Sequence, residues 1–373
     1  MANAPAVSVI IPLYNAEKFL STCLESLLLQ TFTDFEVIIV DDCSTDNSVA
    51  IVESYLPKFN GRLILTRMEK NSGSGALPKK RGVMFSRGEY LTFLDNDDLY
   101  TPTAIEELYT LAKDFDADVV YCEQNYIVNA DGNDLKITEG IGNDFQPVDE
   151  PTFETNDIAQ RVKKILQLIY RAPQWRKFVK RQLLFEHEIF FPHTCHADDV
   201  VWTWGLLFYA KKFLRVPNIT YVYRRNENSI MRQKRTLQGN VDFCLNPLIF
   251  GLKSLDELMS RHEFFQQNPQ YRYALLENFT CIEMTMLFSG KFPSPAICDA
   301  LRQKFGELFG EWDVLISVLF SAMNSQQMSH EANVKKLTAD AAQDKAYIAE
   351  LENYVAQSQR RIAELEAELN RRH

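Results

Sequence analysis

Three carboxylates follow directly on an apolar segment near residue 95. Residues 91–94 have the composition of a strand buried on both faces, and residues 95–98 read Asp-Asn-Asp-Asp. Adjacent carboxylates repel one another unless a cation or fixed hydrogen bonds compensate them. Oxygen ligands of this kind suit Mg²⁺ or Mn²⁺, and substrate phosphates then fill further positions. The alternative is that Asp97 or Asp98 caps a helix beginning near Thr101.

The elements around these carboxylates alternate strand and helix. Residues 7–15 have the composition of a buried strand that ends near Tyr14, and an apolar pattern of helical spacing follows. Residues 35–40 are a second such strand, which runs into Asp41 and Asp42. Strand, helix and strand in this order imply a parallel sheet with right-handed crossovers. Because parallel strands end at one edge of their sheet, we expect all these side chains to line a single site.

The side chains at this edge suit a nucleotide sugar. The ring of Tyr14 offers a face to a base, and carboxylates accept hydrogen bonds from a base imide and from ribose hydroxyls. A divalent ion on the carboxylates at 95–98 would neutralise a diphosphate. The sequence therefore predicts nucleotide-sugar binding.

Three motifs in this order resemble glycosyltransferase family 2, a family of inverting enzymes with the GT-A fold. The motifs are VSVIIPLYNA at residues 7–16, VDDCSTDNS at 40–48 and GEYLTFLDNDD at 88–98. The resemblance extends over about residues 5–230. It implies an α/β fold, a GT-A nucleotide-sugar-binding domain with a mostly parallel sheet and flanking helices.

The resemblance implies roles for residues at the ends of the three strands. Asp97 would ligate the Mn²⁺ or Mg²⁺ ion that bridges the donor diphosphate, and Asp41 or Asp42 would accept from a uracil imide. Asp95 would face the ribose side of the donor. The donor-binding residues implied on these strands are Pro12, Tyr14, Asn15, Asp41, Asp42, Asp95 and Asn96.

Two cations further along are candidates for contact with the diphosphate. Lys79 stands where the family usually reads Ala-Arg-Asn, so a point charge replaces the bidentate arginine. The alternative for this segment is a solvated helix start. Arg224 lies in the segment 221–230, which resembles the family's closing strand and loop, and it would reach the diphosphate when that loop folds over the donor.

The second half of the chain supplies a candidate base. Asp199 falls where the family carries the aspartate that deprotonates the acceptor hydroxyl, and Asp198 replaces the usual glutamate. Attack with inversion at an anomeric carbon needs one carboxylate base on the acceptor side. No acid is needed opposite, because a metal ion stabilises the departing diphosphate. The alternative is that both aspartates only cap the helix predicted at 202–210.

Three residues near the candidate base are candidate contacts with the acceptor, namely Asp198, His196 and Trp175. The sequence His193, Thr, Cys195 and His196 also suggests a zinc site. The seven cysteines include no Cys-x-x-Cys pair and no second cluster at metal-finger spacing, which argues against zinc.

After about residue 235 the pattern becomes helical, and the segments with apolar residues three and four apart are 243–259, 271–288 and 296–323. A heptad pattern then runs from Val334 to Leu369, which predicts a parallel coiled coil and a homo-oligomer. A single amphipathic helix folded onto the body is the alternative. The pattern reaches His373 without a stop signal, which is compatible with a longer natural polypeptide.

We therefore expect four parts in the chain. They are the nucleotide-sugar-binding half of the GT-A domain at 1–100, the acceptor half at 101–232, a helical domain at 233–328 and a coiled coil at 329–373. A hydrophobic content of 46% is ample for a sizeable core.

The overall composition favours a cytoplasmic enzyme. A net charge of −10 argues against nucleic-acid binding, and seven scattered cysteines suit a reducing compartment. The first residues lack the charged and apolar regions of a secretion signal. No apolar run approaches the length of about 18 residues that spans a membrane. Peripheral placement at the inner face of the membrane is a second option.

We expect a metal-dependent inverting glycosyltransferase that moves a sugar from a nucleotide sugar, with a UDP-sugar as first choice, to a hydroxyl of a glycan or lipid-linked glycan in surface polysaccharide synthesis. One rival is an assembly protein with a vestigial transferase fold, but Asp95, Asp97 and Asp199 are all retained. Another is a sugar-nucleotide pyrophosphorylase, which would show a glycine-rich loop with a cation where this chain has Pro-Leu-Tyr-Asn at 12–15. The donor sugar, acceptor and linkage stay open.

Overall fold

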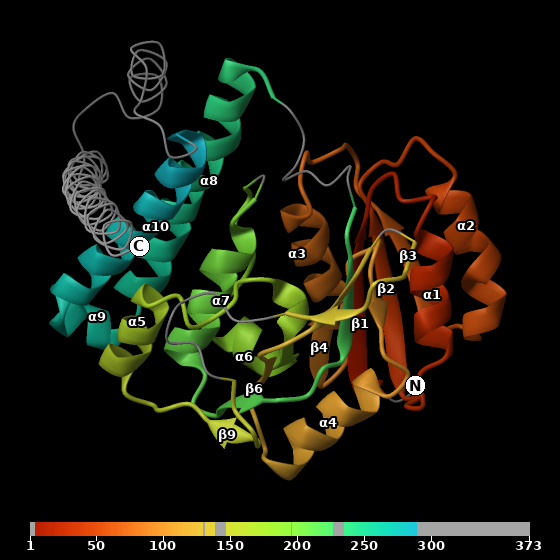
Figure 1. Cartoon of the computed structure of the whole chain (residues 1–373), viewed down its shortest axis with the longest axis horizontal. Helices are drawn as coiled ribbons and strands as arrows, with labels where there is room; N and C mark the ends of the chain where they lie inside the picture. Colours follow the sequence, from red (N-terminus) through yellow and green to blue (C-terminus); the bar gives the residue numbers. More distant parts are fainter. Residues whose placement is uncertain (1–3, 130, 139–146, 195, 227–234, 289–373) are drawn as a thin grey trace, which may run out of the picture. The chain divides into compact units, whose positions relative to one another are not determined.

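The computed structural model describes residues 4–129, 131–138, 147–194, 196–226 and 235–288 (Figure 1). The predicted helix at 296–323 and the predicted coiled coil at 329–373 lie outside the described residues. The division of the chain into four parts stays a prediction.

Four strands of the first hundred residues make the parallel half of a sheet. β1 (Val7–Leu13), β2 (Phe35–Asp41) and β4 (Tyr90–Phe93) are the three strands expected from the sequence, and β3 (Leu63–Arg67) is a fourth. β1 pairs parallel with β2 and β4, and β2 pairs parallel with β3. Every residue of β2 is buried, as expected for a strand covered on both faces.

Helices cover both faces of this half-sheet. α1 (Leu20–Leu28) and α2 (Ser48–Tyr55) lie on one side and α3 (Ala76–Phe85) lies on the other (Figure 1). α3 approaches the sheet closely because Gly82 has no side chain, and a Cβ there would lie 2.4 Å from Cγ2 of Ile10. This close packing fixes the helix that carries Lys79.

The second half of the sheet is mixed. β10 (Lys177–Lys180) lies between β4 and β6 (Val119–Cys122) and pairs antiparallel with both. β11 (Phe213–Val216) is parallel to β6, and β9 (Thr152–Phe153) is antiparallel to β11. The strand order is β3-β2-β1-β4-β10-β6-β11-β9. The sheet is mostly parallel, as predicted, but it is mixed because β10 in its middle and β9 at its edge run in the opposite direction.

The other described elements surround this sheet. A four-stranded sheet in the order β5-β12-β7-β8 consists of β5 (Leu99–Tyr100), β12 (Tyr221–Arg224), β7 (Tyr126–Val128) and β8 (Lys136–Ile137). The further helices are α4 (Ala104–Asp114), α5 (Ile158–Leu166), α6 (Arg181–Glu186), α7 (Asp198–Tyr209), α8 (Leu237–Ser260), α9 (Glu263–Gln267) and α10 (Pro269–Phe288), with short 3-10 helices at Leu56–Phe59 and Gln174–Arg176.

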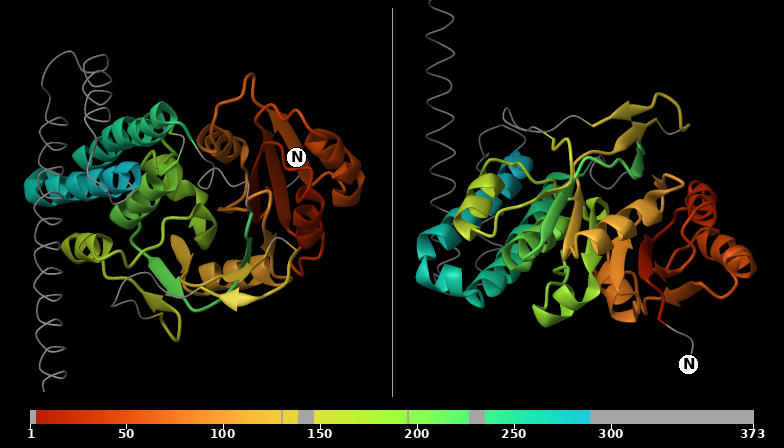
Figure 2. Two further views of the ribbon diagram at one scale, coloured as in Figure 1. Left: turned by 45° about the horizontal axis from the view of Figure 1, so that its top comes forward. Right: turned by 90° about the horizontal axis from the view of Figure 1, so that it is seen from below.

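The helices predicted at 243–259 and 271–288 are present as α8 and α10. α8 packs against both α10 and α7, so the helical segment is joined to the sheet domain through α7 (Figure 2). Within the described part of the chain, no helix is both long and apolar enough to cross a membrane.

Side chains from other segments fix both ends of α7. The buried ring of Trp202 packs edge-on against Phe93, the last residue of β4, with 5.4 Å between ring centroids. At the other end of the helix, Nη1 of the buried Arg161 donates to the carbonyls of Leu207 and Ala210, each at 2.7 Å. A cation at the carboxyl end of a helix satisfies its free carbonyls. The start of α7 is thereby fixed relative to the end of β4.

Candidate active site

The carboxylate of Asp98, in the turn after β4, stabilises the fold. Asp98 is fully buried and accepts hydrogen bonds from the Tyr221 hydroxyl and the Arg224 backbone N–H, both at 2.7 Å. These bonds join β12 to the end of β4. Burial, followed by the charge of Asp97, raises the pKa of Asp98. The alternative that Asp98 caps the next helix is wrong, because its carboxylate is bonded to β12 and α4 begins only at Ala104.

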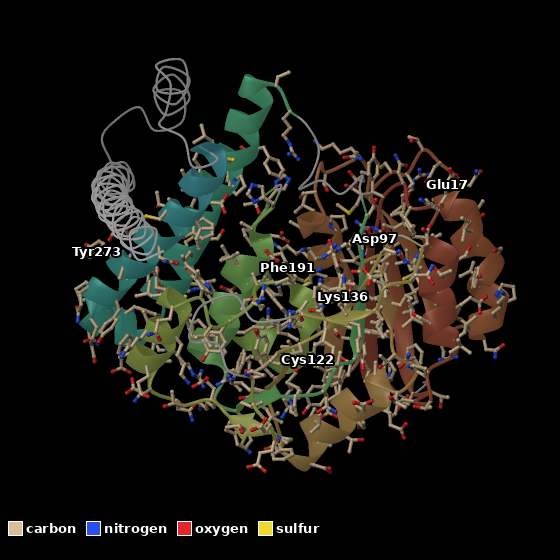
Figure 3. All side chains as sticks on the ribbon, in the orientation of Figure 1. Glu17, Asp97, Cys122, Lys136, Phe191 and Tyr273 are labelled. Atoms are coloured by element: carbon tan, nitrogen blue, oxygen red, sulfur yellow. The ribbon has the colours of Figure 1, made fainter. Side chains whose placement is uncertain are left out.

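Asp95 and Asp97 are the other two carboxylates of this turn, and Asp97 is labelled in Figure 3. Asp95 Oδ1 accepts from the side-chain amide of Gln174 at 2.8 Å, and Asp97 Oδ2 accepts from that of Asn226 at 3.1 Å. Burial, followed by the charge of Asp97, raises the pKa of Asp95 to about 7. Because a cation relieves such repulsion, the pair suits a hard divalent ion.

A larger protein cage for a metal is not found in this region. No three His, Cys, Asp or Glu side chains among the described residues converge on one point. His193 is exposed and His196 is buried, and Cys195 lies outside the described residues. The chemistry of the available ligands therefore fits Mg²⁺ or Mn²⁺, which one or two carboxylates hold together with waters and substrate phosphates.

The carboxylates after β2 are bonded within the protein. Asp41 Oδ2 pairs with Arg67 Nε at 2.9 Å, and its Oδ1 accepts from the Ser44 N–H at 3.0 Å. Asp42 accepts from the Ser72 N–H at 2.9 Å and from the Ser72 hydroxyl at 2.8 Å. Each carboxylate oxygen accepts about two hydrogen bonds, so both side chains retain capacity for a base.

The end of β1 is more open. Tyr14 is 47% exposed. Asn15 has a positive φ of 47°, and its Oδ1 accepts from the Thr45 N–H at 2.8 Å. The side chain of Asn96 donates to the carbonyl of Pro12 at 2.8 Å, which joins β1 to the turn after β4. The ends of β1, β2 and β4 thus meet at one edge, as the sequence predicts.

Lys79 joins α3 to the start of α7. Its Nζ lies 2.5 Å from Asp198 Oδ2, and both side chains are less than a tenth exposed. The ammonium also lies 4.6 Å from the ring centroid of Phe191, which Figure 3 labels. Burial lowers the pKa of Lys79, but the charges of Asp198 and Asp199 outweigh burial and raise it. The cation expected at the donor diphosphate is thus already paired with a residue expected at the acceptor.

Asp199 lies in the first turn of α7 and is surrounded by charges of both signs. Burial, followed by the charge of Asp198, raises its pKa, while Lys79 and Lys177 oppose this rise. Lys177 is itself buried and donates to the carbonyls of residues 171–173 at 2.6, 2.7 and 3.0 Å. A carboxylate with a raised pKa is a stronger base and is better suited to accept a proton.

The remaining predicted residues lie around β12. Arg224 donates from both terminal nitrogens to the hydroxyl of Thr22 in α1, at 3.1 Å each. Its reach to a diphosphate stays a prediction. Trp175 stacks on Tyr221 with 4.1 Å between ring centroids. His196 is buried against α8 rather than open to solvent.

Sequence reasoning missed four residues around the site: Gln174, Asn226, Lys177 and Glu283. Gln174 directly precedes the candidate Trp175, but its partner Asp95 is 79 residues away in the sequence. No local sequence pattern predicts such a pairing. Asn226 lies within the segment 221–230, but sequence reasoning singled out only Arg224 there.

The fold and this site together define a glycosyltransferase of the GT-A type that uses a nucleotide sugar. Residues 8–173 match the family model Glycosyl transferase family 2. The chain is 31% identical over 237 residues to Glycosyltransferase GlyG of Streptococcus pneumoniae serotype 4, which is 61% of this chain and 73% of that protein. The chain belongs to glycosyltransferase family 2, and it is an enzyme of the hexosyltransferase class.

Other similar proteins have names that specify a polymer, poly(ribitol-phosphate). The chain is 33% identical over 222 residues to Poly(ribitol-phosphate) beta-glucosyltransferase of Bacillus spizizenii, which is 58% of this chain and 32% of that protein. The crystal structure of Staphylococcus aureus TarS in complex with UDP-GlcNAc has a TM-score of 0.51 at 20% identity and covers 87% of this chain and 92% of that one. At this identity the structural likeness supports the fold.

Proposed function

We propose that this enzyme transfers a sugar from a UDP-sugar, with inversion, to a hydroxyl of a surface glycan or of its lipid-linked precursor. The observation that carries the proposal is the placement of Asp95 and Asp97 after β4 and of Asp199 at the start of α7. The names of the similar poly(ribitol-phosphate) glycosyltransferases and the UDP-GlcNAc complex of TarS support a UDP donor and a polymeric acceptor. We place the reaction in the cytoplasm, at the inner face of the membrane when the acceptor is lipid-linked.

On the donor side, Tyr14 offers its exposed ring to the base, with Pro12 and Asn15 beside it. Asp41 or Asp42 accepts from the base imide, because each keeps acceptor capacity after its contacts within the protein. Asp97, with Asp95, would hold Mn²⁺ or Mg²⁺, and the bound ion would neutralise charge on the departing diphosphate. The amide of Gln174 holds Asp95 in place for the ribose side.

On the acceptor side, Asp199 takes the proton of the attacking hydroxyl. The new bond joins the hydroxyl oxygen to the anomeric carbon while the bond from that carbon to the diphosphate breaks, and the electron pair leaves with the nucleotide. Asp198 is paired with Lys79, which leaves Asp199 as the proposed base. Trp175 supplies an aromatic face for an acceptor sugar.

The donor assignment predicts binding of uridine nucleotides. Titration calorimetry with Mn²⁺ and a panel of UDP-, GDP- and ADP-sugars should give binding for the UDP-sugars alone. Tyr14→Ala should weaken UDP by about tenfold through lost stacking, which corresponds to about 1.4 kcal/mol. Tyr109→Ala is a matched loss of an aromatic ring away from the proposed site. Preference for GDP- or ADP-sugars would refute the donor assignment.

We also propose that the segment 334–369, outside the described residues, forms a parallel coiled coil that makes the enzyme an oligomer. Light scattering should show a dimer or a larger species for the full chain and a smaller species after deletion of 331–373. Ile348→Asp, on the predicted seam, should weaken association, whereas Ala346→Asp, off the seam, should not. A monomeric full-length chain would contradict the proposal.

A further inference from the structure

α10 places a buried acid beside the loop that leads into α7. Glu283 is 1% exposed, and neither of its carboxyl oxygens has a hydrogen-bond partner in the described structure. Its Oε2 lies 3.6 Å from Nε2 of His196, just beyond hydrogen-bond length. A buried polar group without a hydrogen-bond partner destabilises the folded state, so the retention of Glu283 calls for an explanation.

His196 is fixed on its other side by α8. Its ring lies 4.2 Å, between centroids, from the ring of Phe243, and it hydrogen-bonds with the Phe243 backbone. Because Nε2 has no hydrogen-bond partner, the Phe243 contact uses Nδ1. The tautomer with the proton on Nδ1 leaves Nε2 as an acceptor that faces Glu283.

The next residue, Ala197, has an unfavourable backbone conformation that contacts with neighbouring residues must stabilise. Its φ of 58° lies in the left-handed region, which L-residues seldom adopt. A conformation of this kind persists where the surroundings over-determine it. Ala197 directly precedes α7, so the backbone at His196 and Ala197 leads straight into the helical turn that carries Asp199.

We propose that Glu283 is a positioning residue for Asp199: its protonated carboxyl donates a hydrogen bond to Nε2 of His196 and holds the loop at the start of α7. A movement of a few tenths of an ångström brings the two atoms within hydrogen-bond length. The proposal rests on the role proposed for Asp199. It gives α8 and α10, which lie beyond the segment matched by the family model, a part in the reaction.

The surroundings of Glu283 and His196 favour the neutral form of both side chains. Burial, followed by the charge of Asp199, raises the pKa of Glu283 to about 8, and burial lowers the pKa of His196 to about 4. The groups that act on the pair are Asp198 and Asp199 from α7 and Arg235 from the segment before α8. Below about pH 8 the carboxyl therefore keeps the proton that it donates. Above that pH it ionises, loses the hydrogen bond and repels the charge of Asp199.

The test compares Glu283→Gln, Glu283→Ala and the exposed α8 control Glu257→Gln. The readouts are hydrolysis, with Mn²⁺, of the UDP-sugar that the wild type turns over fastest, and UDP affinity by calorimetry. Glu283→Ala should lower kcat about 10–100-fold at pH 7 with KM and UDP affinity within about twofold, because a misplaced base slows the chemical step. Glu283→Gln keeps a donor, so it should stay within about threefold of the wild type. The control should behave as the wild type.

The pH profile separates positioning from general stability. Wild-type kcat should fall above about pH 8, and Glu283→Gln should lack this fall because an amide does not ionise. The proposal would be overturned if both Glu283 variants had the wild-type pH profile of kcat. It would also be overturned if the kcat of Glu283→Gln still fell above about pH 8. If Glu283→Ala does not fold, the Glu283→Gln profile decides. Loss of activity in Asp199→Asn with normal Glu283 variants would refute this proposal alone, whereas normal activity in Asp199→Asn would refute the base assignment as well.

Discussion

Asp199→Asn should lower sugar transfer by about 10²–10⁴-fold, the usual span for loss of a general base. The amide has nearly the same shape but does not take the proton of the attacking hydroxyl. Donor affinity should stay within a few fold, because Asp199 lies at the start of α7 and not among the strand ends assigned to the nucleotide. Steady-state transfer assays and calorimetry with UDP measure the two effects separately.

Two further variants sharpen this result. Asp198→Asn removes the neighbouring carboxylate, which is paired with Lys79, and Asp149→Asn removes an exposed surface charge. The large loss should appear in Asp199→Asn, with Asp149→Asn unchanged. If Asp198→Asn shows the large loss instead, the base is Asp198 and the two aspartates exchange their proposed roles.

Asp97→Asn should reduce transfer by about 10²-fold or more, because it removes the proposed carboxylate ligand of the metal ion. EDTA should abolish the activity of the wild type, and excess Mn²⁺ should restore it. The fold should survive the substitution, since the described hydrogen bond of the Asp97 carboxylate is with Asn226 alone. Full activity in both the EDTA-treated enzyme and Asp97→Asn would refute the metal assignment.

Asp98→Asn is the matched control for stability. Its two carboxylate oxygens each accept one hydrogen bond from β12, whereas an asparagine has a single acceptor oxygen and can keep only one of the two. The urea midpoint should therefore fall for Asp98→Asn and stay unchanged for Asp97→Asn. Equal loss of stability in the two variants would show that Asp97 also serves the fold.

The strands that carry the donor residues were predictable because their signals are local. Each of the segments around β1, β2 and β4 is a continuous apolar run that ends in polar residues, as strands buried on both faces do. β10 was not predictable by the same rule. It reads Lys-Phe-Val-Lys, and the ammonium of its buried first lysine donates to three backbone carbonyls of the preceding loop, which no apolar pattern predicts.

The roles of individual charges were harder to predict than the site itself. Lys79 and Asp198 were assigned to opposite substrates, and the structure pairs them across a long stretch of sequence. Glu283 reads as an ordinary helical residue until α10 is packed against α7 and α8. Such contacts depend on tertiary packing, which the period of an apolar pattern does not encode.

The position of β10 also bears on how the protein is made. β4 and β6 lack their shared neighbour until residues 177–180 have been synthesised, about 80 residues after β4, which takes about 4–16 s at 5–20 residues per second. During that interval both strands expose unpaired backbone edges, which are prone to pair with other chains. The family-matched segment ends at residue 173, just short of β10. A fragment cut at that residue would keep the donor motifs but lack β10 and β11, so β4 would have a free edge, β6 would lose both of its strand partners, and the fragment would be prone to aggregate.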